Sequence, residues 1–413
     1  MSAIPRLNPW RHAAQRLCAA PHVVALALAL AMPCAAQALY NSVGSETIHT
    51  ELLPGGLDGK YDGEGFVFGV GVKGIYDSNL FITETNEQSD FSFAASPWIS
   101  YNSAPPGGAR FILNARYAPF FRVYLDNSNL NTVDHSGSVS LSYEGAKTTL
   151  QASADYSRFS AVDRLAGAFV EASNFGFSLN GTYQLSQKTS LDASWSAAMT
   201  DYQSARFSSS DTYALQVTGF WQATPLLRLG PSVRHSQIES ANTGRRDALA
   251  FLLSLGYELT GKFSLNASAG IEFEDYERAT GGDTEVQPTG NLSVIYALDA
   301  LWSFQAAVRY RTLSSPSVNN YSIDNLGFSA SVNRALRNGS LRAGAITNFS
   351  HYQAVGPVAA PRTDEENFSL FLGHRMNLFE DQVNLDSSIR FSKNTGQQVW
   401  SRLQLSTGFN YIF

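Results

Sequence analysis

The last residues of the chain alternate between apolar and polar side chains up to the final residue, Phe413. The apolar positions are Val399, Leu403, Leu405, Phe409, Tyr411 and Phe413, and the polar ones are Arg402, Gln404, Ser406, Gly408 and Asn410. Because successive side chains of a β-strand point to opposite faces, this pattern predicts a strand with one apolar and one polar face. The polar face is too polar for a protein core and suits a water-filled space.

The same alternation recurs along most of the chain. Clear runs cover residues 175–183, 191–199, 265–274, 304–311 and 368–375. They have about the length that a tilted membrane-spanning strand needs, and short turns alternate with longer polar loops between them. Counting the runs from Gly65 to Phe413 gives about 18 strands, so we predict an all-β fold: a closed antiparallel transmembrane β-barrel in up-and-down meander order.

The composition favours a membrane barrel over a water-soluble β-protein. Charged residues make up only 15% of the chain and aromatic residues 12%, whereas about a quarter of a soluble protein is usually charged. Soluble propellers and large sandwiches are the alternative architectures with many short strands. They would need a more strongly charged outer face.

The first 38 residues have the features of a secretory signal peptide. Three arginines, Arg6, Arg11 and Arg16, precede an apolar run, and Ala36-Gln37-Ala38 matches the small-residue pattern of a cleavage site. We therefore predict a signal peptide over residues 1–38, a periplasmic N-terminal segment over 39–64 and the barrel over 65–413. Pro33 directly before Cys34 disfavours the alternative of a lipid-modified cysteine.

Removal of this segment would also limit the chemistry of the mature chain. Both cysteines, Cys18 and Cys34, would be lost, and the net charge would become more negative than the −6 of the full chain. We therefore expect no disulfide, no metal site, no cofactor and no nucleic-acid partner. The nearest approach to a nucleophile cluster is Asp134-His135-Ser136, which we expect in a loop, so we predict that the protein is not an enzyme.

Strand parity predicts which charged residues line the lumen. The inward arginines form a basic wall: Arg116, Arg122, Arg309, Arg311, Arg342, Arg375, Arg390 and Arg402. The inward carboxylates form an acidic wall: Asp155, Asp192, Glu272, Glu274 and Glu285. Two such walls would orient charged solutes in the pore, with anions passing along the guanidinium groups. The alternative is that these groups are merely polar lumen residues paired across the barrel.

Large aromatic residues are expected at the two membrane interfaces. Amphipathic rings prefer the headgroup level, and we assign Trp98, Trp195, Trp221, Trp302 and Trp400 to these girdles. Trp221 and Trp302 flank short turns, which places them on the periplasmic side. Stacking of sugars on such rings is the functional alternative.

The C-terminus resembles the assembly signal of outer-membrane barrels. A polar residue, a glycine and two aromatic residues two positions apart are present as Ser406, Gly408, Tyr411 and Phe413. The resemblance implies that the barrel assembly machinery is a partner that receives the last strand by edge pairing. The expected surroundings are the outer-membrane lipid and lipopolysaccharide of a Gram-negative cell.

The first strand resembles another known group. The segment from Gly71 to Phe81 contains Tyr76-Asp77-Ser78-Asn79-Leu80-Phe81 and is similar to the opening of the β-barrel porin 2 family. The resemblance implies a porin-like architecture, and many members are associated with exopolysaccharide synthesis or export. We predict an outer-membrane channel for passive passage of small hydrophilic or anionic solutes. The alternative is a barrel component of an exopolysaccharide system without general porin activity, whose partner would be a polysaccharide.

Overall fold

The computed structural model describes residues 65–103, 110–166, 168–241, 244–259, 261–277, 284–314, 321–354, 363–379 and 382–413. The predicted signal peptide and the predicted periplasmic segment, residues 1–64, lie outside the described residues, so both stay predictions. Among the residues described, no helix has the length and apolar character to cross a membrane.

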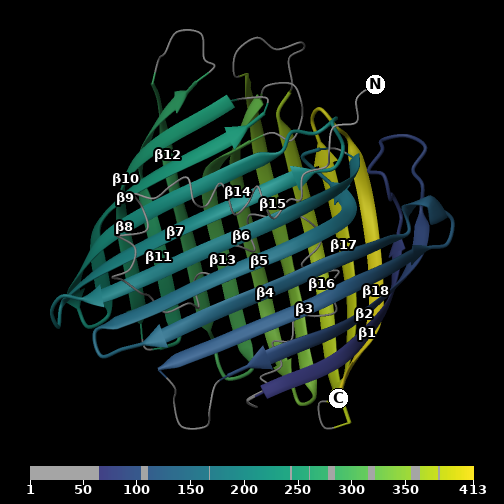
Figure 1. Cartoon of the computed structure of the whole chain (residues 1–413), viewed down its shortest axis with the longest axis horizontal. Helices are drawn as coiled ribbons and strands as arrows, with labels where there is room; N and C mark the ends of the chain where they lie inside the picture. Colours follow the sequence, from purple (N-terminus) through teal and green to yellow (C-terminus); the bar gives the residue numbers. More distant parts are fainter. Residues whose placement is uncertain are drawn as a thin grey trace, which may run out of the picture.

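The described chain forms one sheet of 18 strands that closes on itself (Figure 1). The strands are β1 Gly65–Asp77, β2 Asp90–Asn102, β3 Phe111–Tyr124, β4 Thr132–Glu144, β5 Thr148–Asp163, β6 Ala168–Gln184, β7 Thr189–Tyr202, β8 Ser210–Thr224, β9 Leu227–Ser240, β10 Gly244–Leu259, β11 Phe263–Tyr276, β12 Glu285–Ala297, β13 Trp302–Ser314, β14 Tyr321–Leu336, β15 Gly339–Ala354, β16 Glu365–Leu378, β17 Val383–Thr395 and β18 Trp400–Ile412. Each strand pairs antiparallel with its neighbours in the chain, and β1 pairs with β18 from Gly69 opposite Ile412 to Asp77 opposite Gln404. The predicted closed meander barrel is confirmed.

The outer face of the barrel is apolar, as strand parity predicted. Phe66, Phe68 and Val72 on β1 are 65%, 50% and 50% exposed, and their neighbours in sequence are more buried. Phe251 and Leu253 on β10 are exposed in the same way, at 49% and 61%. So much exposed apolar surface around a closed sheet requires an apolar surrounding medium, because it would associate in water.

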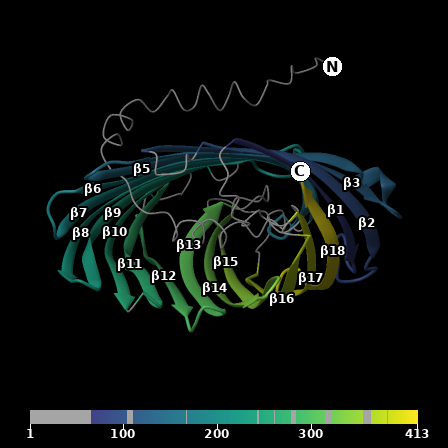
Figure 2. The ribbon, with the colours of Figure 1, turned by 90° about the horizontal axis from the view of Figure 1, so that it is seen from below.

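The two ends of the barrel differ in their connections. At the end called here the turn end, residues 225–226 and 337–338 join consecutive strands, and Phe413 lies there near the start of β1 (Figure 1). At the opposite end, called here the loop end, the connections are longer and include residues 78–89 and 203–209. Viewed from below, the sheet forms a flattened ring, with β5 and β6 on the side opposite β13–β15 (Figure 2).

Two of the predicted girdle tryptophans are instead inside the barrel. Trp98 and Trp400 are only 4% and 6% exposed, and Trp98 Nε1 donates a hydrogen bond to Asn410 Oδ1 at 2.9 Å. Both lie on the inner parity of their strands, so the girdle assignment was wrong for these two. The Trp98 ring lies against Gly69, where an added Cβ would be 2.2 Å from the ring. Gly69 has no side chain, and this makes room for the Trp98 ring.

Candidate pore and its constriction

The β13–β14 hairpin leaves the wall near the loop end, and its tip enters the barrel. Pairing of β12 with β13 stops at Gly290 opposite Tyr310, whereas pairing of β13 with β14 continues to Ser314 opposite Ser322. Pro288 lies two residues before Gly290 on β12, towards the loop end, and has no N–H to donate to a neighbouring strand. The hairpin tip beyond Tyr310 therefore lacks a paired neighbour on the β12 side.

Contacts with the inner face of β11 fix the position of this tip. Thr312 and Asp324 are cross-strand partners. They have the same parity as Phe328, which lies nearer the turn end and faces outward. Yet Thr312 Oγ1 lies 2.9 Å from Asp324 Oδ1 and 3.2 Å from Oε1 of Glu274, which is on the inner face of β11. Tyr276 Oη, also on β11, donates to Ser322 Oγ at 3.2 Å. The outer face of the tip thus packs on the inner face of the barrel.

A second hairpin tip, that of β5 and β6, is also buried on both faces. Phe159, Ala161 and Val162 are 3–4% exposed although they include both parities. Leu165, in the connection after β5, packs against a cluster of Tyr321, Ile323 and Tyr352 on β14 and β15. The two hairpin tips therefore meet inside the loop end and narrow it.

The connection between β1 and β2 closes another part of the same end. Ile82 packs with Val162 and Trp400, so this loop also folds inward. Asn79 holds it, because Nδ2 donates to Thr83 O at 2.7 Å and to Ser401 O at 3.0 Å. The segment that resembles the β-barrel porin 2 family therefore has a structural role: it fastens a loop to the last strand at the seam.

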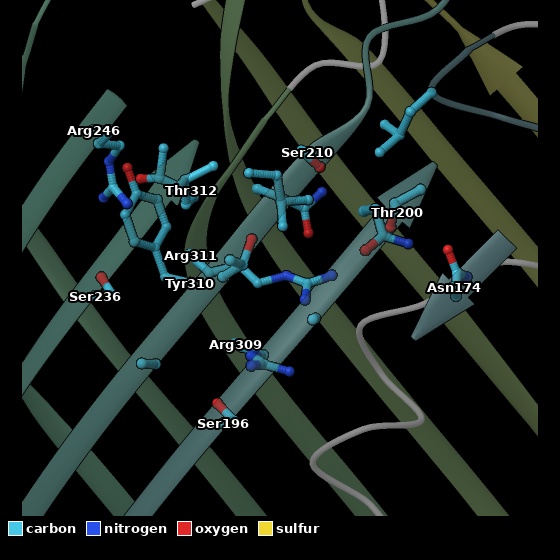
Figure 3. Close-up of a pocket in the computed structure, with 18 of the residues that line it drawn as sticks. Asn174, Ser196, Thr200, Ser210, Ser236, Arg246, Arg309, Tyr310, Arg311 and Thr312 are labelled. Atoms are coloured by element: carbon cyan, nitrogen blue, oxygen red, sulfur yellow. The ribbon is translucent and has the colours of Figure 1, made fainter. Parts of the chain in front are cut away.

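A cavity of about 420 Å³ remains beside the two tips (Figure 3). One side is lined by small polar residues of β6–β9, namely Asn174, Ser196, Thr200, Ser210 and Ser236. The other carries Arg309 and Arg311 of β13, whose side chains extend into this space (Figure 3). The cavity is polar: besides Arg309 and Arg311 its lining includes the arginines Arg164, Arg234 and Arg246 and the carboxylates of Asp163 and Glu272.

All eight predicted arginines lie on the inner parity of their strands, but several are engaged in local contacts. Arg402 forms a fork with Asp77 across the β1–β18 seam, with Nε 2.9 Å from Oδ1 and Nη2 bonded to Oδ2. Arg375 Nε donates to Asp386 Oδ1 at 2.8 Å. Charges that are matched in this way contribute less to the field felt by a solute.

The two arginines of β3 stack on aromatic rings. The Cζ atom of Arg116 is 5.5 Å from the Trp98 ring centroid. Arg122 is 6% exposed, with Nη1 donating to Tyr124 Oη at 2.9 Å and Cζ 5.1 Å from the Phe120 ring. Buried among rings, Arg122 supports the wall. The arginines of β13, β15 and β17, which are Arg309, Arg311, Arg342 and Arg390, belong with Arg375 to the inner face of β13–β17, called here the arginine wall.

Three of the five carboxylates predicted to form an acidic wall lie beside arginines. Arg246 of β10 donates from Nη2 to Glu272 Oε1 at 2.7 Å and from Nε to Glu274 Oε2 at 2.9 Å. Arg234 of β9 donates from Nη2 to Glu272 Oε2 at 2.7 Å. A third arginine, Arg228, has Nη1 4.0 Å from an oxygen of Asp192. The inner face of β9–β12, called here the paired wall, therefore joins carboxylates to arginines.

Parity applied to β9 and β10 would have identified these three arginines. Arg228 and Arg234 share the parity of the buried Ser232 and are opposite to the exposed Val233. The other two predicted carboxylates have different surroundings. Asp155 on β5 lies over Gly176, and Glu285 accepts a hydrogen bond from Gln353 Nε2 at 3.4 Å.

The three residues that come nearest to a nucleophile cluster in the sequence are separated by the sheet. Asp134, His135 and Ser136 lie within β4 and not in a loop, so that placement was wrong. His135 Nδ1 is 2.8 Å from Tyr117 Oη, while Asp134 is buried on the other face and accepts from Ser160 Oγ at 3.0 Å. No group of three or more potential metal ligands occurs among the described residues.

The residues of the predicted assembly signal lie at the turn end of β18. Ser406 and Gly408 are on the inner parity, and Tyr411 and Phe413 are 40% and 74% exposed. A Cβ added at Gly408 would lie 2.5 Å from Val72 O, so a side chain there would crowd the β1–β18 seam. Recognition by the assembly machinery stays a prediction.

The class of protein follows from these features. A closed antiparallel barrel with an apolar outer face and a polar interior is the architecture of outer-membrane β-barrel proteins, because it satisfies every backbone polar group within the wall.

Comparison with known proteins adds no family. No family of known sequences matches the chain, and no curated protein matches it. The resemblance to the β-barrel porin 2 family stays a prediction.

Solved structures with some similarity are outer-membrane proteins. OpdK of Pseudomonas aeruginosa, solved with vanillate, has 11% identity and a TM-score of 0.45, with 84% of this chain and 99% of that chain covered. OccAB4 of Acinetobacter baumannii has 12% identity and a TM-score of 0.43, covering 84% and 98%. The iron transporter FrpB of Neisseria meningitidis has 12% identity and a TM-score of 0.40, with 80% of this chain and 62% of that chain covered. The chain thus spans less than two thirds of FrpB, and it covers 60% of the ferric citrate transporter FecA.

Proposed function

We propose that the protein is a porin-like outer-membrane channel for small hydrophilic solutes, with a preference for anions, and that it is narrowed at the loop end by its own hairpin tips. The observation that carries the proposal is the polar cavity of about 420 Å³ with Arg309 and Arg311 at its side. A cavity of this size suits a small solute better than an extended polymer with side branches.

The charge distribution supports the preference for anions. The paired wall matches Glu272 and Glu274 with Arg234 and Arg246. On the arginine wall, Arg375 is matched by Asp386. Arg309, Arg311, Arg342 and Arg390 also lie on the inner face of the arginine wall, and planar guanidinium groups bind carboxylates in two-point contacts.

The test is ion selectivity of the refolded barrel in planar bilayers. We expect stable conductance steps and a reversal potential on the anion side in a potassium chloride gradient. The double variant Arg309→Ala/Arg311→Ala should shift the reversal potential towards cations by an amount that is larger at low salt, because screening weakens the field of exposed charges. Arg334→Ala is the control, since Arg334 stacks on the Trp302 ring at 4.9 Å on the outer face.

Two outcomes would contradict the proposal. A folded, heat-modifiable barrel that gives no conductance would exclude an open channel. Conductance with an unchanged reversal potential in the double variant would exclude a role for Arg309 and Arg311 in anion selection. The exopolysaccharide alternative would be favoured by the first of these outcomes.

A further inference from the structure

The arginine wall contains a gap in its side-chain surface at Gly373 of β16. A Cβ built at this position would have its nearest heavy atoms, two backbone oxygens, 4.0 Å away. Most inner-face glycines of the barrel are crowded; at Gly344, for example, a Cβ would be 2.5 Å from the Phe371 ring. No other side chain therefore fills the space in front of Gly373.

Positively charged and hydroxyl-bearing side chains surround this gap. In the strand register, Arg342 lies opposite Gly373 on β15 and Ser388 lies opposite it on β17. Along β16 itself, the next inner-face positions are Phe371 and Arg375. The gap thus has a guanidinium group on one side, a hydroxyl on the other and an aromatic ring above it.

The Phe371 ring holds two guanidinium groups near each other. The Cζ atom of Arg342 is 5.4 Å from the ring centroid and that of Arg390 is 6.0 Å from it. Stacking on a ring fixes the plane of a guanidinium group and leaves its N–H edge available for a planar oxyanion. Two like charges on one ring also repel each other, and a bound anion would offset that repulsion.

The nearby carboxylate is already matched. Asp386 accepts the hydrogen bond of Arg375 Nε at 2.8 Å, and both side chains are only about a quarter exposed. Ser388 Oγ lies 2.7 Å from Ser406 Oγ on the next strand, and both residues are partly accessible from the lumen. Arg342 therefore places a positive charge beside the gap, with hydroxyl groups next to it.

We propose that the gap at Gly373 is a binding site for the carboxylate group of a small organic acid, in which Arg342 and Ser388 contact the carboxylate and Phe371 and Arg390 orient Arg342. This site lies nearer the turn end than the cavity with Arg309 and Arg311, because Arg342 is close to the start of β15. The proposal rests on the proposed channel function for the route by which the acid reaches the site. Two sites in series allow a solute to bind and still leave.

The test uses succinate as the probe and the complete refolded barrel in detergent micelles, with binding measured by calorimetry. Gly373→Val fills the gap without any change of charge, and the open space at its Cβ makes it compatible with the strand. We expect about a tenfold weaker affinity, the effect of losing a charge-assisted contact. Arg342→Lys, which keeps the charge but loses the planar fork, should weaken binding by a similar factor.

Ala307→Val is the matched control. Ala307 lies on the inner face of β13, opposite Ser329, so this change narrows the same wall at a distance from the gap. It should leave the succinate affinity unchanged. Equal affinities of the wild type, Gly373→Val and Arg342→Lys would overturn the proposed site, as would the absence of saturable binding to the wild type.

Conductance separates this proposal from the channel function. A wild-type barrel that conducts but binds succinate equally well after Gly373→Val would overturn the site and leave the channel standing. A barrel that binds succinate at the gap and gives no conductance would overturn the channel and retain the site. Heat-modifiable migration of each variant on gels verifies that it is folded.

Discussion

The paired wall and the arginine wall both present arginines to the interior, yet they have different consequences for a solute. On the paired wall, Arg246 is 6% exposed and bonded to two carboxylates, Glu272 and Glu274. On the arginine wall, Arg309 and Arg342 lie beside polar space and an aromatic ring. Where a strand stays in the wall, parity decides the face of a charged residue, and its cross-strand neighbours decide whether that charge acts on the protein or on the solute.

The largest expected effect comes from breaking the paired wall. Arg246→Ala would leave Glu272 and Glu274, which are 5% and 0% exposed, without their shared partner. Removal of one member of a buried ion pair costs about 3–5 kcal/mol, so the free energy of unfolding in urea should fall by that amount. Arg245→Ala is the control one residue away, because its ion pair with Asp247 is about half exposed and worth at most about 1 kcal/mol. Equal losses in both variants would contradict the distinction between the walls.

Arg402 tests the same distinction at the seam. Its fork with Asp77 has side chains that are 6% and 8% exposed, whereas those of Arg375 and Asp386 are 28% and 27% exposed. Arg402→Ala should lower the free energy of unfolding by about 3 kcal/mol and Arg375→Ala by about 1 kcal/mol, because water screens the second pair. The measurement is urea unfolding in detergent or lipid. A larger loss for Arg375→Ala would show that exposure does not rank these pairs.

Glu274 connects the paired wall to the constriction, and its substitution should lower the stability less than Arg246→Ala does. Glu274→Gln keeps the side-chain shape but removes the charge that faces Arg246 and weakens the contact with Thr312. A lost charge-assisted hydrogen bond costs about 1.5–3 kcal/mol, and we expect more frequent large conductance steps as the β13–β14 tip is released. Glu239→Gln on the outer face is the control. An unchanged step distribution would show that Glu274 does not hold the tip.

Much of the barrel could be predicted from the sequence, for a local reason. Alternation with a period of two is a property of each strand, and it correctly predicted the outer face at Leu405 and Phe409 and the closed sheet of 18 strands. The same rule, applied to Trp98 and Arg234, would have placed them inside the barrel. Trp98 was assigned to a girdle by residue type, and Arg234 was not assigned to either wall.

Other features were decided by the tertiary structure alone. Thr312 and Asp324 have outward parity, yet they lie near Glu274 inside the barrel. The tip of their hairpin leaves the wall beyond Tyr310, where pairing with β12 ends. Leu165 reaches Ile323 in the same region although the two are far apart in the sequence. The sequence by itself determined which side of each strand is apolar, since that depends on neighbours along the chain. The inward hairpin tips, the carboxylates paired with arginines and the gap at Gly373 depend on contacts between strands, so only the folded barrel could reveal them.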